Sequence, residues 1–263
     1  MTQSRKAVLI DLDGTVVHGG SLLEGAASGI NAIKEAGLAV LFLTNNPTRS
    51  PTGWADHLTE LGVPVEPDEV LTSAIATVQY LDAHYASHRV LPIAGPAVLE
   101  QLQEADILFV DDPAEADVVV AGYHEGFDFD NLTQGLRAVL NGADLVGTDP
   151  DRWIPTTGGP IPGSGAVCNA IAGAAEAEPS AVLGKPSQET VDLATRRLSV
   201  PAEHCLMIGD RLNTDVAMGE QAGMETALVL TGATRRGDVE ISPIQPDHVL
   251  ESLGGIADLL ESK

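Results

Sequence analysis

The stretch AVLIDLDGT, residues 7–15, decides the fold expected of this chain. Its apolar run is continuous rather than alternating, which is typical of a strand covered on both faces in a parallel sheet. The run ends in two carboxylates, Asp11 and Asp13, and Gly14 then allows the chain to turn closely around a ligand. Because ligands bind beyond the carboxyl ends of strands in open α/β sheets, the two aspartates are candidates for a functional site.

A solvated acidic turn is the alternative interpretation of Asp11 and Asp13, since the chain carries 38 acidic residues. A calcium loop of the EF-hand type is excluded, because that loop needs glycine at its sixth position and further oxygen ligands. Whether Asp11 and Asp13 belong to a functional site or to a solvated turn therefore depends on the motifs found elsewhere in the chain.

Length and composition point to a globular α/β protein. With 263 residues, 44% of them apolar, the chain can form one large domain or two smaller ones. No apolar run approaches the roughly 18 residues of a membrane span, and Asp11 interrupts the first run too early for a secretory signal. We therefore expect a cytoplasmic protein. Cys168 and Cys205 lack the spacing of a disulfide framework or a zinc site, so a metal would have to use oxygen ligands.

The formal net charge is −24, and lysine is scarce among the basic residues. Such a charge argues against a nucleic acid or an anionic membrane as partner, because either would need a basic face. Strong acidity with few lysines and few aromatic residues resembles the composition of proteins from salt-loving organisms. An ordinary acidic mesophilic enzyme is the alternative.

Apolar strands and helical stretches alternate in both terminal parts of the chain. The first part has strands at 7–10 and 38–43 and helices at 24–36 and 51–61. The second part repeats the alternation, with strands at 181–183, 205–208 and 226–230 and helices at 189–198 and 214–222. This order predicts an α/β fold with a doubly wound, Rossmann-like parallel sheet.

A separate α/β block lies between these parts. It has expected strands at 90–93, 107–110, 118–121 and 145–147 and helices at 96–103 and 132–140. The glycine and proline cluster at 155–165 predicts a mobile loop. We therefore expect a discontinuous core over 1–85 and 180–263, with an inserted domain over 86–179.

Polar side chains stand at the predicted ends of four strands. They are Asp11 with Asp13, Thr44 with Asn45, Lys185, and Asp210 with Asp215. Because a doubly wound sheet gathers such ends into one crevice, a shared site explains the set better than a solvated acidic turn does.

Phosphoryl transfer through a carboxylate nucleophile fits this set of side chains. An aspartate such as Asp11 can attack phosphorus and form an aspartyl phosphate. That attack brings two anions together, and Mg²⁺ bound by the oxygens of Asp11 and Asp210 would offset the charge. Asp13 is then available as general acid toward the leaving oxygen and as base toward water.

Three further groups can bind the phosphoryl oxygens. Lys185 supplies a compact positive charge. Thr44 can donate its hydroxyl, and backbone N–H groups around Asn45 can complete the phosphate site. The set predicts a small phosphorylated metabolite as the substrate.

In order and in strand context, these motifs resemble those of phosphatases of the haloacid dehalogenase superfamily. DLDGT at 11–15 is similar to the first motif, Thr44 to the second, Lys185 to the third, and GDRLNTD at 209–215 to the fourth. The resemblance spans nearly the whole chain, so a Rossmann-like catalytic core is implied.

The resemblance also implies roles for individual residues. Asp11 would be the nucleophile and Asp13 the acid/base. Mg²⁺ would be held by the Asp11 carboxylate, the Asp13 main-chain oxygen and Asp210. Asp215 would support the site through water or through Lys185.

The large insertion, together with LTNNPTRS at 43–50 and PGSGA at 162–166, resembles the NagD-like phosphatases with a C2-type α/β cap. Such a cap covers the active site and helps to select the leaving group. Relatives often associate through their caps, which implies a homodimer. This family often has asparagine where the present chain has Asp149, so substrate preference does not carry over directly.

A Mg²⁺-dependent phosphatase is therefore the leading expectation. Its substrate would be a small monoester such as a sugar or polyol phosphate, phosphoglycolate or p-nitrophenyl phosphate. The alternatives are a phosphotransferase or mutase on the same core, and a non-catalytic protein that binds a phosphorylated metabolite. A complete set of catalytic groups argues against the last, since binding alone needs no nucleophile.

Overall fold

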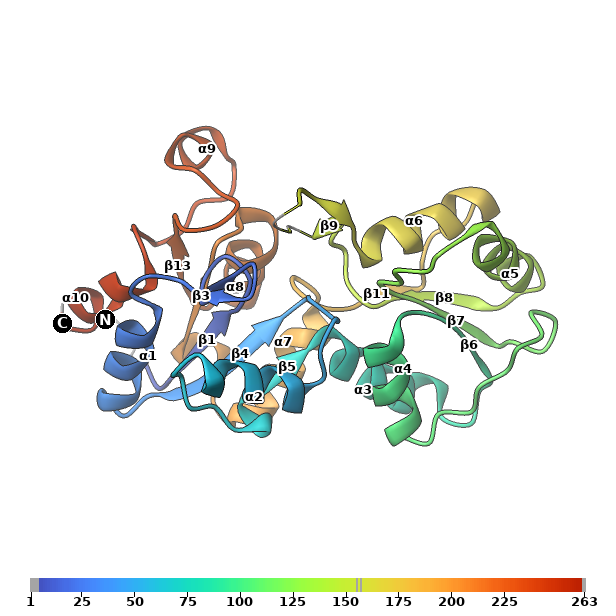
Figure 1. The fold of residues 1–263 in the computed structure, drawn as a ribbon, viewed down its shortest axis with the longest axis horizontal. Helices are drawn as coiled ribbons and strands as arrows, with labels where there is room; N and C mark the ends of the chain where they lie inside the picture. Colours follow the sequence, from blue (N-terminus) through green and yellow to red (C-terminus); the bar gives the residue numbers. More distant parts are fainter. Residues whose placement is uncertain (1–4, 155, 157, 262–263) are drawn as a thin grey trace. The chain divides into compact units, whose positions relative to one another are not determined.

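A computed structural model describes residues 5–154, 156 and 158–261, and the chain divides into two compact units (Figure 1). The core unit runs to Thr44, resumes over Pro51–Leu71 and continues from Lys185. The inserted unit comprises Asn45–Ser50 and Thr72–Gly184. Contacts thus place its start at Thr72, whereas the sequence suggested a boundary after residue 85.

The core unit contains a six-stranded sheet with the order β14-β13-β12-β1-β4-β5. Its strands are β1 (Ala7–Asp11), β4 (Ala39–Thr44), β5 (Val70–Thr72), β12 (Cys205–Gly209), β13 (Glu225–Val229) and β14 (His248–Leu250). β1 pairs in parallel with β4 on one side and with β12 on the other. The chain therefore winds outward from β1 in both directions, which confirms the doubly wound fold and makes the carboxyl end of β1 its switch point.

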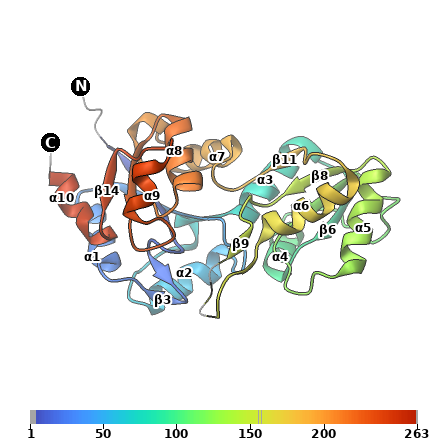
Figure 2. The ribbon, with the colours of Figure 1, turned by 90° about the horizontal axis from the view of Figure 1, so that it is seen from above.

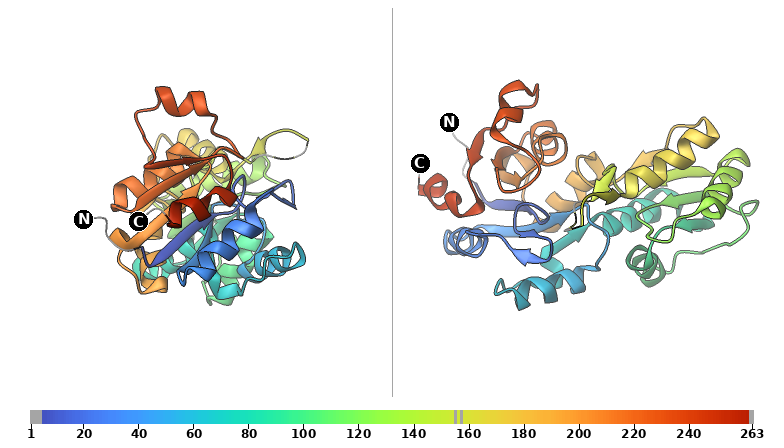
Figure 3. Two further views of the ribbon diagram at one scale, coloured as in Figure 1. Left: turned by 90° about the vertical axis from the view of Figure 1, so that its left-hand side faces the viewer. Right: turned by 45° about the horizontal axis from the view of Figure 1, so that its top comes forward.

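Five of the described helices cover this sheet, namely α1 (Ala26–Glu35), α2 (Pro51–Glu60), α7 (Gln188–Leu198), α8 (Ala217–Ala222) and α10 (Ile256–Glu261). A further helix, α9 (Arg236–Ile241), buries none of its residues. Val8 and Ile10 of β1 belong to the same buried cluster as Ile30 of α1 and Leu58 of α2. Two-residue periodicity explains why alternate strand residues share that face. Figure 3 shows α10, in red, beside α1, in blue, and the two helices are in contact.

The inserted unit has its own parallel sheet, with the order β11-β8-β7-β6. Its strands are β6 (Val90–Ile93), β7 (Val118–Ala121), β8 (Asp144–Gly147) and β11 (Ala181–Val182), and its helices are α3 (Ser73–Tyr85), α4 (Pro96–Glu104), α5 (Phe129–Leu140) and α6 (Ser164–Ala175). α5 and α6 lie side by side (Figure 2). Ile93, Leu145, Ala138 and Ile171 form part of one buried cluster between sheet and helices.

The remaining elements are short. Two antiparallel strand pairs are β2 (Val17–His18) with β3 (Ser21–Leu22), and β9 (Trp153–Ile154) with β10 (Ile161–Pro162). The helical turns are the 3₁₀ turns η1 (Pro67–Glu69), η2 (Ala202–His204) and η4 (Leu253–Gly255) and the π-helical turn η3 (Leu212–Val216). η3 occupies the first part of the helix expected over 214–222, and α8 continues it. None of the helices in the described part of the chain combines the length and the apolar character that crossing a bilayer requires.

The strand expected over residues 107–110 does not form. This segment makes a single bridge, between Phe109 and Val90, and Leu108 is 56% exposed. A short run at the edge of the sheet that leaves its apolar side chain in water gains too little from burial to extend the pairing.

The loop expected over 155–165 contains part of a hairpin, in which β10 pairs with β9. Residues 155 and 157 of that loop lie outside the described residues. Strands of two residues are too short to show periodicity, which explains why the sequence did not predict them.

Candidate active site

Four buried charged side chains meet in the core unit. Asp11 is the last residue of β1, and Asp210 follows β12 directly. Asp215 lies in η3, and Lys185 begins the last segment of the core unit. All four are at most 5% exposed. Asp11 and Asp210 thus stand at the carboxyl ends of two central strands, whereas the strand expected over 181–183 before Lys185 is β11, which pairs with β8 in the inserted unit instead of joining the core sheet.

Lys185 is held by two carboxylates and one carbonyl. Its Nζ donates to Oδ1 of Asp11, lies 2.7 Å from Oδ1 of Asp215, and donates to the carbonyl oxygen of Leu43 at 3.1 Å. Burial alone would lower the pKa of Lys185, but Asp11 and Asp215 outweigh that effect and raise it above its ordinary value. Lys185 therefore stays charged.

Asp11, Asp210 and Asp215 each offer an oxygen within 4.8 Å of the others. Burial, followed by repulsion from the other two carboxylates, raises the pKa of Asp11 well above its usual range, although Lys185 acts in the opposite direction. Burial, followed by Asp215, raises the pKa of Asp210 to about 7. These raised pKa values indicate that the single positive charge of Lys185 does not offset the mutual repulsion of the three carboxylates.

A hard divalent cation fits this excess charge. Within the described residues, Oδ2 of Asp11 is buried without a hydrogen-bond partner. A buried oxygen of this kind is costly unless something binds it, and oxygen donors are the ligands that Mg²⁺ prefers. The donor set is therefore suitable for Mg²⁺.

Two glycine-containing loops enclose Asp210. A Cβ at Gly14, where φ is +94°, would lie 2.5 Å from Oδ2 of Asp210, and a Cβ at Gly232 would overlap the same atom. The backbone N–H of Ala233 donates to this Oδ2 at 2.5 Å, and Thr231 Oγ1 donates to the carbonyl of Gly14 at 2.6 Å. Close backbone approach therefore fixes the direction of the Asp210 carboxylate. The 231–234 loop was not predicted, because its signal in the sequence is a glycine after β13.

We expect Gly232→Ala to weaken Mg²⁺ binding by at least about tenfold, because the added methyl group displaces the Asp210 carboxylate. Titration calorimetry with Mg²⁺ alone measures the change. Gly237→Ala in α9 is the matched control, since a Cβ there meets nothing within 4 Å. Equal Mg²⁺ affinity in both variants would contradict a role of this loop at the metal site.

The other predicted residues lie at the expected strand ends. Asp13 is half-buried, and its backbone bridges to Val17. Thr44 is the buried last residue of β4 and follows Leu43, whose carbonyl binds Lys185. Asn45 is buried as well, but its contacts assign it to the inserted unit.

Asp215 is held by Lys185 and by the backbone of the fourth motif. Besides its ion pair with Lys185, its Oδ2 accepts from the backbone N–H of Arg211 at 3.0 Å. A Cβ at Gly209 would overlap Asp215, so only glycine fits there. Asp215 therefore contacts Lys185 directly, which is one of the two alternatives that the resemblance implied for it.

Two family models match this chain. A family model described as haloacid dehalogenase-like hydrolase matches residues 8–108, and a second, HAD-hydrolase-like model matches 182–256. The chain is 32% identical over 258 residues to the sugar-phosphatase AraL of Bacillus subtilis, covering 98% of this chain and 94% of that protein. This protein is a haloacid dehalogenase-like hydrolase.

Solved structures place this hydrolase in the NagD-like group. The p-nitrophenyl phosphatase from Archaeoglobus fulgidus superposes with a TM-score of 0.91 at 32% identity, covering 98% of this chain and all (100%) of that one. NagD from E. coli K-12 superposes with a TM-score of 0.87 at 28% identity, covering 96% and 98%. The family and the fold expected from the motifs are both confirmed.

Proposed function

We propose that this hydrolase is a Mg²⁺-dependent phosphatase that cleaves a small phosphate monoester through an aspartyl phosphate on Asp11. The observation that carries the proposal is the buried Asp11 carboxylate at the switch point. Its Oδ1 accepts a hydrogen bond from Lys185, and its Oδ2 has no hydrogen-bond partner among the described residues. A carboxylate so placed can bind a metal and attack phosphorus. The names of the relatives, a sugar-phosphatase and a p-nitrophenyl phosphatase, support this reaction class.

Asp11 would attack the phosphorus atom and release the alcohol, whose oxygen takes a proton from Asp13. Asp13 would then take a proton from the water that hydrolyses the aspartyl phosphate, so that both groups return to their initial state. Lys185, the hydroxyl of Thr44 and the backbone N–H groups near Asn45 would hold the phosphoryl oxygens.

The Asp11 carboxylate, the Asp13 main-chain oxygen and Asp210 would hold Mg²⁺. When bound, Mg²⁺ supplies positive charge that offsets the approach of a carboxylate to a phosphate. Asp215 would keep Lys185 in position from the opposite side. The inserted unit would act as the cap that selects the leaving group.

Mg²⁺ binding is expected to strengthen about tenfold between pH 6 and pH 8. A carboxyl group must be ionised to bind the metal, and the pKa of Asp210 is about 7 without it, so most of this group is protonated at pH 6. Calorimetry in two buffers of different ionisation enthalpy measures both affinity and proton release. An affinity that does not change with pH would contradict this account of the carboxylate cluster.

Hydrolysis assays test the function itself. We expect release of phosphate from p-nitrophenyl phosphate or a sugar phosphate with Mg²⁺, loss of activity with EDTA and recovery on adding Mg²⁺. Transfer of the phosphoryl group to an added sugar in place of water would indicate a phosphotransferase. Tight binding of one phosphorylated metabolite, without turnover across a panel of such compounds, would contradict an enzymatic role.

The net charge of −24 supports adaptation to high salt, because salt screens the mutual repulsion of acidic groups. Running the same assays at low and at high salt tests this adaptation: we expect higher activity and stability at high salt. The homodimer and the cytoplasmic location remain predictions.

A further inference from the structure

Asp149 is a buried carboxyl group to which the proposed reaction assigns no role. It lies two residues beyond β8 in the inserted unit and is 1% exposed. Its Oδ2 accepts from Thr148 Oγ1 at 3.2 Å, its Oδ1 accepts from the backbone N–H of Asp151 at 3.1 Å, and the Ser164 side chain also forms a hydrogen bond with it. These contacts hold the carboxyl group in one place.

Ser164 connects Asp149 to the base of the β9–β10 hairpin. Ser164 Oγ accepts from the backbone N–H of Tyr123 at 3.0 Å, so its own proton is available to Asp149. On either side, Gly163 donates to the carbonyl of Arg152 at 3.0 Å, and Gly165 donates to the carbonyl of Asp151 at 2.9 Å. Close backbone packing therefore accounts for both glycines of the PGSGA stretch.

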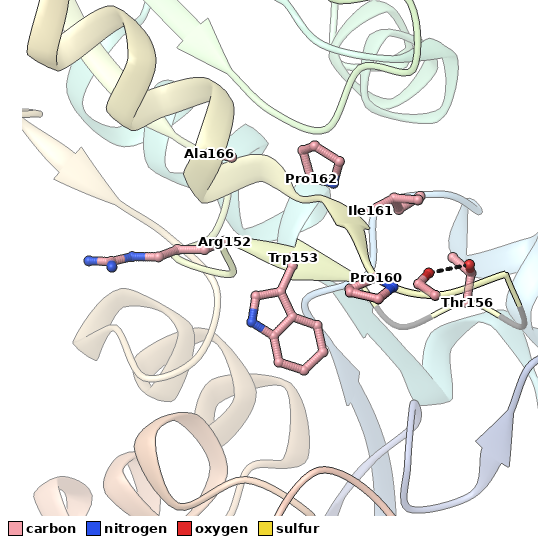
Figure 4. A pocket seen from close by; sticks show the side chains of 8 residues that line it. Arg152, Trp153, Thr156, Pro160, Ile161, Pro162 and Ala166 are labelled. Atoms are coloured by element: carbon pink, nitrogen blue, oxygen red, sulfur yellow. Dashed lines mark hydrogen bonds between the residues drawn. The ribbon is translucent and has the colours of Figure 1, made fainter.

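The hairpin beyond this base lines a cavity of about 590 Å³ with Trp153, Pro160 and Ile161 among its walls (Figure 4). Thr156 Oγ1 donates to the carbonyl of Gly159 at 2.6 Å and closes the turn. Arg152, which accepts from Gly163 at the base of the hairpin, also lines this cavity.

On its other side, Asp149 packs against Gly184. A Cβ at Gly184, where φ is +70°, would lie 2.6 Å from Oδ1 of Asn45 and 2.9 Å from Cβ of Asp149. Asn45 directly follows Thr44, and Gly184 directly precedes Lys185. Within the inserted unit, Asp149 and Asn45 thus both pack against Gly184, the residue before Lys185.

Asp151 and the thiol of Cys168 on α6 are ionisable groups that interact with Asp149. Burial, followed by Asp151, raises the pKa of Asp149 to about 7, although its hydrogen bonds act in the opposite direction. Burial and Asp149 raise the pKa of Cys168 to about 11, so this thiol stays neutral near pH 7. Asp149 therefore changes charge close to neutral pH.

We propose that Asp149 is a positioning residue that holds Gly184, and through it Lys185, when its carboxyl group is neutral, and that loosens this contact when it ionises. A neutral carboxyl group suits the dry packing against Gly184, whereas a carboxylate draws water into it. The inference rests on the proposed function, because Lys185 has its role there.

Asp149→Asn tests this inference, because asparagine has the shape of the neutral acid and does not titrate. With p-nitrophenyl phosphate and Mg²⁺, we expect the ratio of variant to wild-type kcat to rise by at least about threefold from pH 5.5 to pH 8.5, with a smaller change in KM. A ratio that stays constant over this range would overturn the proposal.

Two further variants should shift the pH at which kcat falls, and they should shift it in opposite directions. Ser164→Ala removes a hydrogen bond that favours the carboxylate, so the fall in kcat moves to higher pH. Asp151→Asn removes a neighbouring negative charge, so the fall moves to lower pH. Shifts in the same direction for both variants would also overturn the assignment to Asp149.

Thermal unfolding gives a readout that does not depend on turnover. The pKa of Asp149 is higher in the folded than in the unfolded protein, so its burial costs stability progressively as pH rises from about 4 to about 7. We expect the melting temperature of Asp149→Asn to exceed that of the wild type by a few degrees more at pH 8.5 than at pH 5.5. An equal difference in melting temperature at both pH values would contradict the ionisation of Asp149 between them. Absence of hydrolysis by the wild type would instead contradict the proposed function.

Discussion

Asp11→Asn is expected to reduce hydrolysis of p-nitrophenyl phosphate by at least about 10³-fold, because an amide oxygen is a poor nucleophile toward phosphorus. The variant also removes one charge from a buried cluster of three carboxylates, so Mg²⁺ should bind more weakly. Steady-state assays at saturating Mg²⁺ separate the two effects, since only the loss of the nucleophile persists there.

Two further variants sharpen this test. Asp11→Ala should lose as much activity as Asp11→Asn, which excludes slow conversion of asparagine back to aspartate. Asp192→Asn, on the exposed side of α7, is the matched control and should leave kcat within about twofold of the wild type, as expected of surface changes. Activity of Asp11→Ala within tenfold of the wild type would show that another group is the nucleophile.

Lys185→Met is expected to lower the free energy of unfolding by about 3–5 kcal/mol at pH 8, because it leaves buried carboxylates without their ammonium partner. Lys185 also lowers the pKa of Asp11, so in the variant Asp11 binds a proton up to higher pH. The folded variant thus keeps protons that the unfolded chain releases, and its loss of stability grows from pH 5 to pH 8. Hydrolysis should fall by at least about 10²-fold.

Denaturant unfolding at both pH values measures this loss. Lys34→Met is the matched control: Lys34 lies 3.4 Å from Glu69 at the surface, so its removal should cost less than about 1 kcal/mol. A Lys185→Met variant as stable as Lys34→Met at pH 8 would contradict the account of Lys185 as the ion-pair partner of the buried carboxylates.

The sequence predicted the central strands and the groups at their ends because both signals are local. A continuous apolar run that stops at a charged residue marks β1 with Asp11, and the same rule marks β12 with Asp210. The topology of parallel sheets then brings these ends together. Strand, helix and motif order therefore sufficed for the fold and the family.

Features that depend on backbone packing could not be predicted in this way. α3 buries Ser73 and Thr77 along with small apolar residues, so it shows no distinct apolar face that a sequence pattern would reveal. Ala233 binds Asp210 through its backbone N–H, which any residue except proline offers. The close packing of Gly184 against Asp149 likewise leaves no mark in a single sequence beyond a glycine.

Trapping the covalent intermediate tests the central claim most directly. Wild-type protein mixed with p-nitrophenyl phosphate and Mg²⁺ is quenched in acid during the first turnover and treated with borohydride, which reduces an acyl phosphate to an alcohol. Mass spectrometry of the peptide that contains residue 11 should show homoserine in place of Asp11. Homoserine at a different aspartate, or none at any aspartate although p-nitrophenol is released in a burst, would contradict an aspartyl phosphate on Asp11.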